Sequence, residues 1–207
     1  MRCTTLSLVA LSGFISTAQA SIVGTTGNIL QIAPPVSVNP GALLTNVNAF
    51  AFNEQQNRTF AGLGDITVNP SVAPPLTPGP WAGLINSHFI HVNPGGTGAI
   101  FTLNGTVTFN GNIVAVMLSS PGNIPPANLD ATDGLGAFGT VYPTGFPTRG
   151  WNGLGTIAIA GPTITFNNVV VQTQGLDQFR VVTQVPATGS AALLGLAGLV
   201  SMRRRRP

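Results

Sequence analysis

The sequence predicts an all-β fold, namely an antiparallel β-sandwich of jelly-roll or immunoglobulin-like type. Glycine and proline, with 26 and 17 of the 207 residues, interrupt the chain throughout and mark turns. Between them, Val, Ile, Thr and Phe recur in short runs, as strands require. No helical periodicity is found between the two apolar ends of the chain. We therefore expect roughly eight to ten short strands joined by turns.

The first twenty residues predict a secretory signal peptide that forms a signal helix. Arg2 supplies the positive charge, residues 6–15 form an apolar core, and Ala18 and Ala20 fit an Ala-x-Ala cleavage site. Cleavage there would start the mature protein at Ser21, outside the cytoplasm. The only cysteine, Cys3, would leave with this segment, so the mature protein has neither a disulfide nor a thiol nucleophile.

Residues 21–184 form the predicted β-sandwich domain. They contain three arginines, five acidic residues and no lysine, which gives a formal net charge of −2. The other five arginines lie in the two terminal segments. A domain with so few cations lacks the basic surface that nucleic-acid phosphates require, so nucleic acid is excluded as a partner.

The clearest strand covers residues 100–109. Positions 101, 103, 107 and 109 are apolar, whereas positions 102, 104, 106 and 108 are Thr or Asn. This alternation predicts one face in the core and the other in solvent. Asn110 and Gly111 favour a tight hairpin turn into residues 113–118. That apolar run predicts a strand buried on both faces.

Further strands are predicted at residues 47–52, 58–61, 66–68, 84–92, 155–160, 163–171 and 178–184. Residues 22–44 are expected to form a lead-in with one edge strand. The five prolines within residues 70–80 predict a loop, because proline cannot join a central strand. Residues 121–133 are a connection with room for one helical turn.

Few side chains are candidates for chemistry. His88 and His91 lie three apart in a predicted strand and thus on opposite faces, which favours structural hydrogen bonding over joint metal binding. Asp130 and Asp133, on a loop with Gly134, are the best calcium candidates. The alternative is that these two aspartates cap a turn.

The remaining charged residues favour ion pairs over catalysis. Glu54, Asp177, Arg149 and Arg180 are so few in an uncharged chain that some are expected to pair and to fix strand register. No Gly-x-Ser-x-Gly elbow is present, and nothing positively supports two carboxylates placed for glycosidase chemistry. We expect no catalytic activity.

Three aromatic residues lie on or beside loops rich in proline and glycine. They are Trp81, Tyr142 and Trp151, and each is a candidate for stacking on a sugar ring. The alternative is that each closes one end of the sandwich. The first interpretation predicts a carbohydrate-binding module that docks on exopolysaccharide, with or without calcium.

Residues 185–207 combine a short motif, an apolar run and a basic end. The motif is Val185, Pro186, Ala187 and Thr188, and the last charges are Arg203, Arg204, Arg205 and Arg206. Residues 187–202 carry no charge and would span roughly 24 Å as a helix, somewhat less than the roughly 30 Å hydrocarbon core. An arginine cluster directly after an apolar run follows the positive-inside pattern, so we expect a transmembrane helix with cytoplasmic arginines.

This C-terminal segment resembles the PEP-CTERM sorting signal of exported bacterial proteins. The family motif reads Val-Pro-Glu-Pro, of which Val185 and Pro186 are present. The blocks at residues 52–57, 86–91, 139–145 and 176–183 resemble, in order, a passenger domain seen on such proteins. The resemblance implies transient anchoring in the inner membrane, processing by an exosortase-like protease and a final place at the cell surface or in the extracellular matrix.

A second route of processing is also compatible with this segment. Residues 185–189 read Val-Pro-Ala-Thr-Gly and differ only at the first position from the Leu-Pro-x-Thr-Gly motif that sortases cut. A surface protein anchored by a sortase is therefore the alternative.

Overall fold

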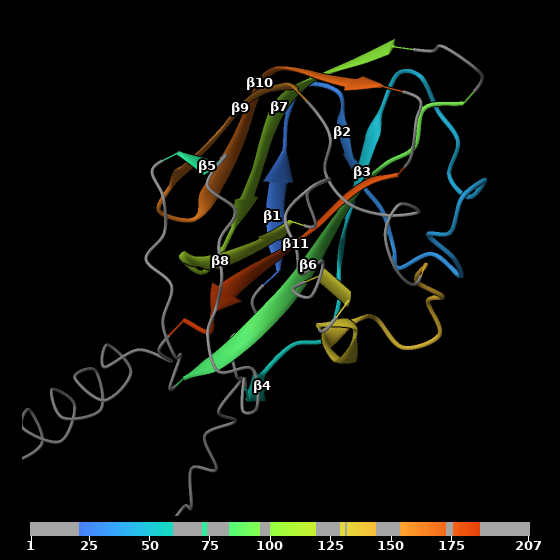
Figure 1. The fold of residues 1–207 in the computed structure, drawn as a ribbon. Coiled ribbons are helices and arrows are strands. Elements are labelled where there is room, and N and C mark those ends of the chain that lie inside the picture. Colours follow the sequence, from blue (N-terminus) through green and yellow to red (C-terminus); the bar gives the residue numbers. More distant parts are fainter. Residues whose placement is uncertain are drawn as a thin grey trace, which may run out of the picture.

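The computed structural model describes residues 21–59, 72–73, 83–95, 100–118, 129–130, 132–143, 154–172 and 176–186. Within these ranges the chain is almost entirely β and forms two sheets that lie face to face (Figure 1). The predicted signal peptide, the residues after Pro186 and the predicted strand at 66–68 lie outside the described residues. Among the described residues, no helix is long and apolar enough to cross a membrane.

The first sheet has five strands in the order β1-β7-β10-β9-β5. Their bounds are β1 Ile22–Thr25, β5 Val72–Ala73, β7 Ile100–Phe109, β9 Leu154–Ala160 and β10 Thr163–Gln172. All neighbours pair antiparallel except β5, which runs parallel to β9 at the sheet edge. Residues 70–80 are thus not wholly a loop, but their strand has only two residues and an edge position.

The second sheet has six strands in the order β2-β3-β6-β11-β8, with β4 also paired to β6. Their bounds are β2 Ile29–Gln31, β3 Ala49–Asn53, β4 Arg58–Thr59, β6 Leu84–Val92, β8 Ile113–Leu118 and β11 Asp177–Gln184. Only β2 and β3 pair parallel. The predicted lead-in therefore holds two strands, one at an edge of each sheet.

The predicted hairpin between residues 100–109 and 113–118 is wrong. β7 belongs to the first sheet, whereas β8 pairs with β11 in the second. The turn crosses between the sheets because Asn112 accepts a hydrogen bond from Gln184 N–H at 3.0 Å. Gly111 lies so close to Gln184 that an added Cβ would be 2.1 Å from its carbonyl oxygen. The turn is thus shaped by β11, and not by β7–β8 pairing.

The core between the sheets follows the predicted alternation. Phe101, Leu103, Val107 and Phe109 of β7 are buried, while Thr102 and Asn104 are exposed. From the other sheet, Ile90, Phe179 and Val181 join the same apolar cluster. The predicted strand at 113–118 is also confirmed as buried on both faces: Val116 enters this cluster, and Met117 enters a second one.

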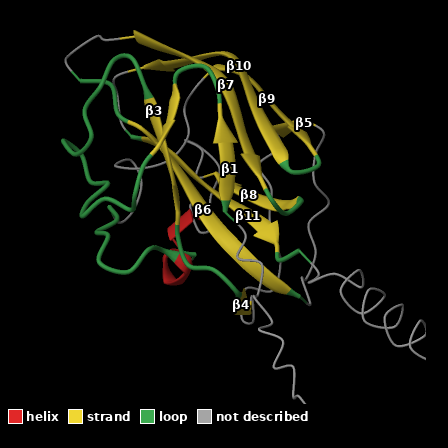
Figure 2. Cartoon of the chain, turned by 180° about the vertical axis from the view of Figure 1, so that it is seen from behind, coloured by secondary structure: helices red, strands yellow, loops and turns green. Residues whose placement is uncertain are grey.

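A layer of loops covers the outer face of the six-stranded sheet. It contains the short 3-10 helix η1 (Asp133–Leu135), which Figure 2 shows beside β6, and the segment around Val38. Val38 N–H donates to Val141 O, and Val141 N–H donates to Val36 O, so the two loops hold each other. Beneath them lies the second apolar cluster, with Phe52, Phe89 and Val182.

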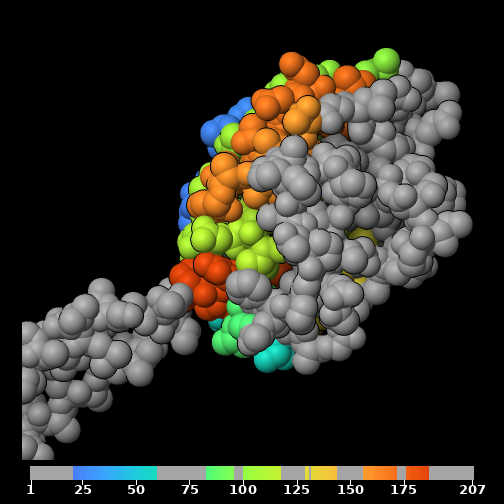
Figure 3. Space-filling model, turned by 60° about the vertical axis from the view of Figure 1, so that its left-hand side comes forward, coloured from blue at the N-terminus to red at the C-terminus, as the bar shows by residue number. Residues whose placement is uncertain are grey.

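The first and last described residues meet at one end of the sandwich. Ser21 N–H donates to Asn110 Oδ1 at 2.9 Å, while Gln184 N–H donates to Asn112 O two residues further along the same turn. Val185 N–H then donates to Leu84 O, at the start of β6. In Figure 3 the end of β11 (red) lies against β6 (green) and β4 (cyan) at this end of the molecule.

Candidate functional site

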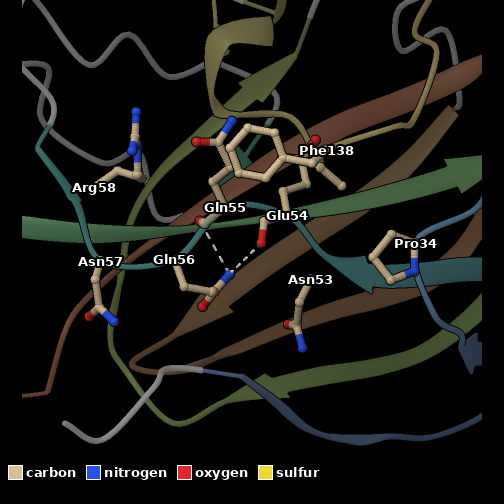
Figure 4. Close-up of a pocket in the computed structure, with 9 residues that line it drawn as sticks. Pro34, Asn53, Glu54, Gln55, Gln56, Asn57, Arg58 and Phe138 are labelled. Carbon is tan, nitrogen blue, oxygen red and sulfur yellow. Dashed lines mark hydrogen bonds between the residues drawn. The ribbon is translucent and has the colours of Figure 1, made fainter.

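A pocket of about 340 Å³ opens where the chain leaves β3 and passes under the loop layer. Residues 53–58 form one wall, and Pro34, Ala137 and Phe138 form the other side (Figure 4). Four of the five lining residues from 53 to 57 carry side-chain amides, namely Asn53, Gln55, Gln56 and Asn57. The pocket is therefore rich in uncharged hydrogen-bonding groups.

The wall at residues 54–57 follows β6 without regular ladder pairing. Glu54 N–H donates to Ser87 O, and Ser87 N–H donates to Gln55 O. At Asn57 the backbone turns left-handed, with φ of 54°, which Asn tolerates better than most residues. Asn86 Oδ1 fixes this turn by accepting the Asn57 N–H at 2.9 Å. β4 then begins at Arg58.

Two glutamine amides fasten the wall. Gln55 Nε2 donates to the carbonyls of Gly134 and Gly136 at 2.9 and 2.8 Å, which ties the wall to η1. Gln56 Nε2 turns back on the main chain and donates to the carbonyls of Glu54 and Gln55 (Figure 4). It also donates to the Ser87 carbonyl. The Oε1 atoms of both glutamines are buried and have no hydrogen-bond partner within the described ranges. The wall is thus rigid but short of donors.

Phe138 forms the rim of the pocket and is 87% exposed. It is presented by a turn in which Gly139 has a φ of 80°, a conformation that favours glycine. Behind the turn, Ala137 N–H donates to Tyr142 Oη at 2.9 Å, so the loop is held from within. The aromatic ring is therefore held out in solvent by an ordered loop.

Beneath the pocket, Arg180 of β11 makes a fully buried ion pair with Glu54. Its Nε and Nη2 donate to the two Glu54 oxygens at 2.6 and 2.9 Å. Nη1 donates to Leu129 O and Thr132 Oγ1, and Nη2 also donates to Asp133 Oδ1 at 3.1 Å. Hence all five guanidinium N–H groups have acceptors. The expected pairing is confirmed for Arg180 and Glu54, and it joins β11, β3 and the loop layer.

Aromatic rings enclose this ion pair. The Arg180 Cζ lies 5.4 Å from the centroid of Phe89 and 5.6 Å from that of Tyr142. Burial opposes the charge of Arg180, but the neighbouring Glu54 carboxylate outweighs it and raises the arginine pKa. The pKa of Tyr142 is also raised, first by burial and then by the charge of Glu54. Arg180 therefore stays charged and Tyr142 stays neutral at neutral pH.

The two histidines lie on opposite faces of β6, as their spacing predicts. His88 Nδ1 is 2.8 Å from Asn53 Oδ1 and Nε2 is 3.1 Å from Thr183 Oγ1, in the layer between the sheets. On the other face, His91 contacts Gln178 Nε2 and Ala42 O at 2.9 and 3.3 Å. Burial lowers the pKa of His88 to about 3 and that of His91 to about 4, so both are neutral at pH 7. Their roles are structural hydrogen bonds.

The other predicted site residues are distributed as follows. Asp133 directs one oxygen to Arg180, and Asp130 lies three residues before it and is half-buried. Among the described residues, no group of three or more His, Cys, Asp or Glu side chains is placed to hold a metal ion. The calcium site stays a prediction. Tyr142 is half-buried and packs edge-on against Phe89.

Several predicted residues lie outside the described ranges. They are Ala18, Ala20, Trp81, Arg149, Trp151, Ala187, Thr188 and Arg203 to Arg206. The first two residues of the predicted sorting motif, Val185 and Pro186, are half-buried against the domain end.

Sequence reasoning did not find the amide-lined pocket or Phe138. The run Asn53 to Asn57 offered a signal, because four amide side chains in five residues are unusual next to a strand. Comparisons with family models, curated proteins and solved structures find no match for this chain.

Proposed function

We propose that this chain is an exported, non-enzymatic protein of the cell surface or extracellular matrix. In this proposal, the export machinery removes residues 1–20, and residues 187–202 hold the chain in the inner membrane as a helix. An exosortase-like transpeptidase then cuts near Pro186. The domain between is a sandwich of jelly-roll or immunoglobulin-like type.

The meeting of the two domain ends carries this proposal. Ser21 and Gln184 are both bonded to the turn at residues 110–112, so the segments that precede and follow the domain leave from one end. Both segments can therefore reach the same membrane while the sandwich stands clear of it.

The hydrogen bonding of the polar core supports a non-enzymatic role. Both ring nitrogens of His88 and of His91 have structural partners. Both Glu54 oxygens are held by Arg180, and Oε2 also accepts from Ser87 Oγ at 2.5 Å. Groups that serve elsewhere as general bases are thus committed to the architecture.

Replacement of Arg203 to Arg206 by glutamine tests the sorting proposal. We expect the native protein in the extracellular fraction. Its mass should correspond to a chain that begins at Ser21 and ends near Pro186. The variant should keep residues 187–207 and should be found in a different cell fraction from the native protein. The reason is that the positive cluster that fixes the membrane orientation is lost. Identical mass and location for both chains would refute the proposal. A cut between Thr188 and Gly189 would instead identify the sortase route.

A further inference from the structure

We propose that the pocket between residues 53–58 and Phe138 binds a sugar ring of a polysaccharide. This inference rests on the proposed function only in the source of the ligand, because an exported domain meets polysaccharide outside the cell. Binding itself depends on the pocket and not on how the C-terminal segment is processed.

The lining of the pocket fits a ligand rich in hydroxyl groups. Asn57 contributes an amide and Arg58 contributes an exposed guanidinium, whereas the Oδ1 of Asn53 is already occupied by the Ile22 N–H and by His88. The one acid in the wall, Glu54, is buried and neutralised by Arg180. The pocket therefore offers uncharged donors and acceptors with a single cation at its edge. Its volume of about 340 Å³ is in the range of small-ligand sites.

Phe138 supplies the apolar half of sugar recognition. A pyranose ring has an apolar face of C–H groups, which packs on an aromatic ring, and polar edges, which need hydrogen bonds. Phe138 projects into solvent from a turn that is held by Tyr142 and Gly139, although the burial of its apolar ring would be favourable. A ligand that covers the ring removes this exposed apolar area from water.

The wall is already ordered before any ligand arrives. The glutamine amides hold residues 54–56 to η1 and to β6, and Asn86 holds the left-handed turn at Asn57. The binding of a ligand therefore costs little conformational entropy in the protein.

The edge cation separates two kinds of sugar. Arg58 can donate to ring hydroxyls or, as a bidentate partner, to the carboxylate of an acidic sugar. The chemistry that both share is the pyranose ring on Phe138 with hydroxyls on the amides. Neutral and acidic polysaccharides are therefore separate arms of one experiment.

The test uses the protein as it is purified from producing cells, from whichever fraction contains it, and isothermal titration calorimetry. The probes are dextran, polygalacturonate and the soluble polysaccharide that the same cells release. We expect binding to at least one probe, and a loss of about tenfold in affinity for Phe138→Ala, or about 1.4 kcal/mol. Val141→Ala, an exposed apolar control on the same loop but outside the pocket, should bind as the native protein does.

Two more variants make the result independent of folding. Asn57→Gly removes the amide but tolerates the positive φ, so it should weaken binding and leave the thermal unfolding midpoint within a few degrees. Arg58→Gln should weaken binding to polygalacturonate more than to dextran. Absence of binding to all three probes would overturn the proposal, and so would unchanged binding in both Phe138→Ala and Asn57→Gly. Neither result depends on where the protein is sorted.

Discussion

On the inner face of the six-stranded sheet, Phe179 and Val181 of β11 meet the apolar side chains of the other sheet. On the outer face, Gln178 and Arg180 of the same strand are just as deeply buried, but under loops. The inner contact joins two regular surfaces, and apolar area suffices to hold it. The outer contact joins a sheet to irregular loops, whose position has to be specified by directed bonds. Arg180 supplies three of them, to Leu129, Thr132 and Asp133.

Acidification should destabilise the contacts on both faces of the six-stranded sheet, and it should have the largest effect of the changes considered. The buried histidines have folded pKa values of about 3 and 4, below the unfolded value of about 6.5, so unfolded chains bind more protons. Stability should be constant above pH 6.5 and fall below it, with a loss of about 3 kcal/mol per histidine at pH 4. Urea unfolding at pH 7 and pH 4 measures this loss.

The control for the acid effect is His88→Gln, which removes one of the two titrations. This variant should be less stable at pH 7 but should lose less on acidification. Equal stability of the native protein at pH 7 and pH 4 would contradict the burial of neutral histidines.

Glu54→Ala should break the outer face selectively. It leaves the Arg180 guanidinium buried without its main counter-charge, and such losses cost about 3–5 kcal/mol. Equilibrium urea denaturation at pH 7 checks this value. The double variant Glu54→Leu with Arg180→Met should be considerably more stable than the single one, since neither charge remains. If the Glu54→Ala variant had the stability of the native protein, the Arg180 cluster would not be what holds the loops.

Leu103→Ala should break the inner face instead. Leu103 is fully buried between the sheets, and a leucine truncation in a core costs about 3 kcal/mol. The same denaturation series measures it. Because the two faces are separate, the loss of unfolding free energy in Leu103→Ala should add to the loss in Glu54→Ala. Strong non-additivity would show that the two layers unfold as one coupled network.

Asp133→Asn should have the smallest effect. Its side chain is 27% exposed, and its contact with Arg180 supplements a charge that Glu54 already balances. Solvent screens such a contact, so we expect a loss of at most about 1 kcal/mol. Thermal unfolding in low and high salt measures it. A loss as large as that of Glu54→Ala would place the main counter-charge at Asp133.

The contrast between the faces also explains what the sequence could predict. The period-two pattern of β7 is a direct consequence of facing a core on one side and water on the other, so its burial was readable. The partner of β8 was not, because Asn110 and Gly111 define a turn without stating which sheet the next strand joins. That choice depends on Gln184, seventy-odd residues later in the chain.

The candidate site was harder to predict for the same reason. The scarcity of charges predicted that Arg180 would pair, and Glu54 was among the few available acids. The pocket arises where an irregular wall meets a loop from a distant part of the chain, and such contacts leave no periodic pattern. An exposed Phe138 is indistinguishable from a core phenylalanine until the turn at Gly139 is seen.

The shared exit of the two ends has a mechanical consequence. In the proposed attachment through the C-terminal side, tension would enter at Gln184 and run along β11, which lies between β6 and β8. Antiparallel hydrogen bonds stand perpendicular to the strand, so a pull along β11 loads its two ladders in shear rather than opening them one rung at a time. Under the proposed attachment, the load would fall on a strand that is paired on both sides.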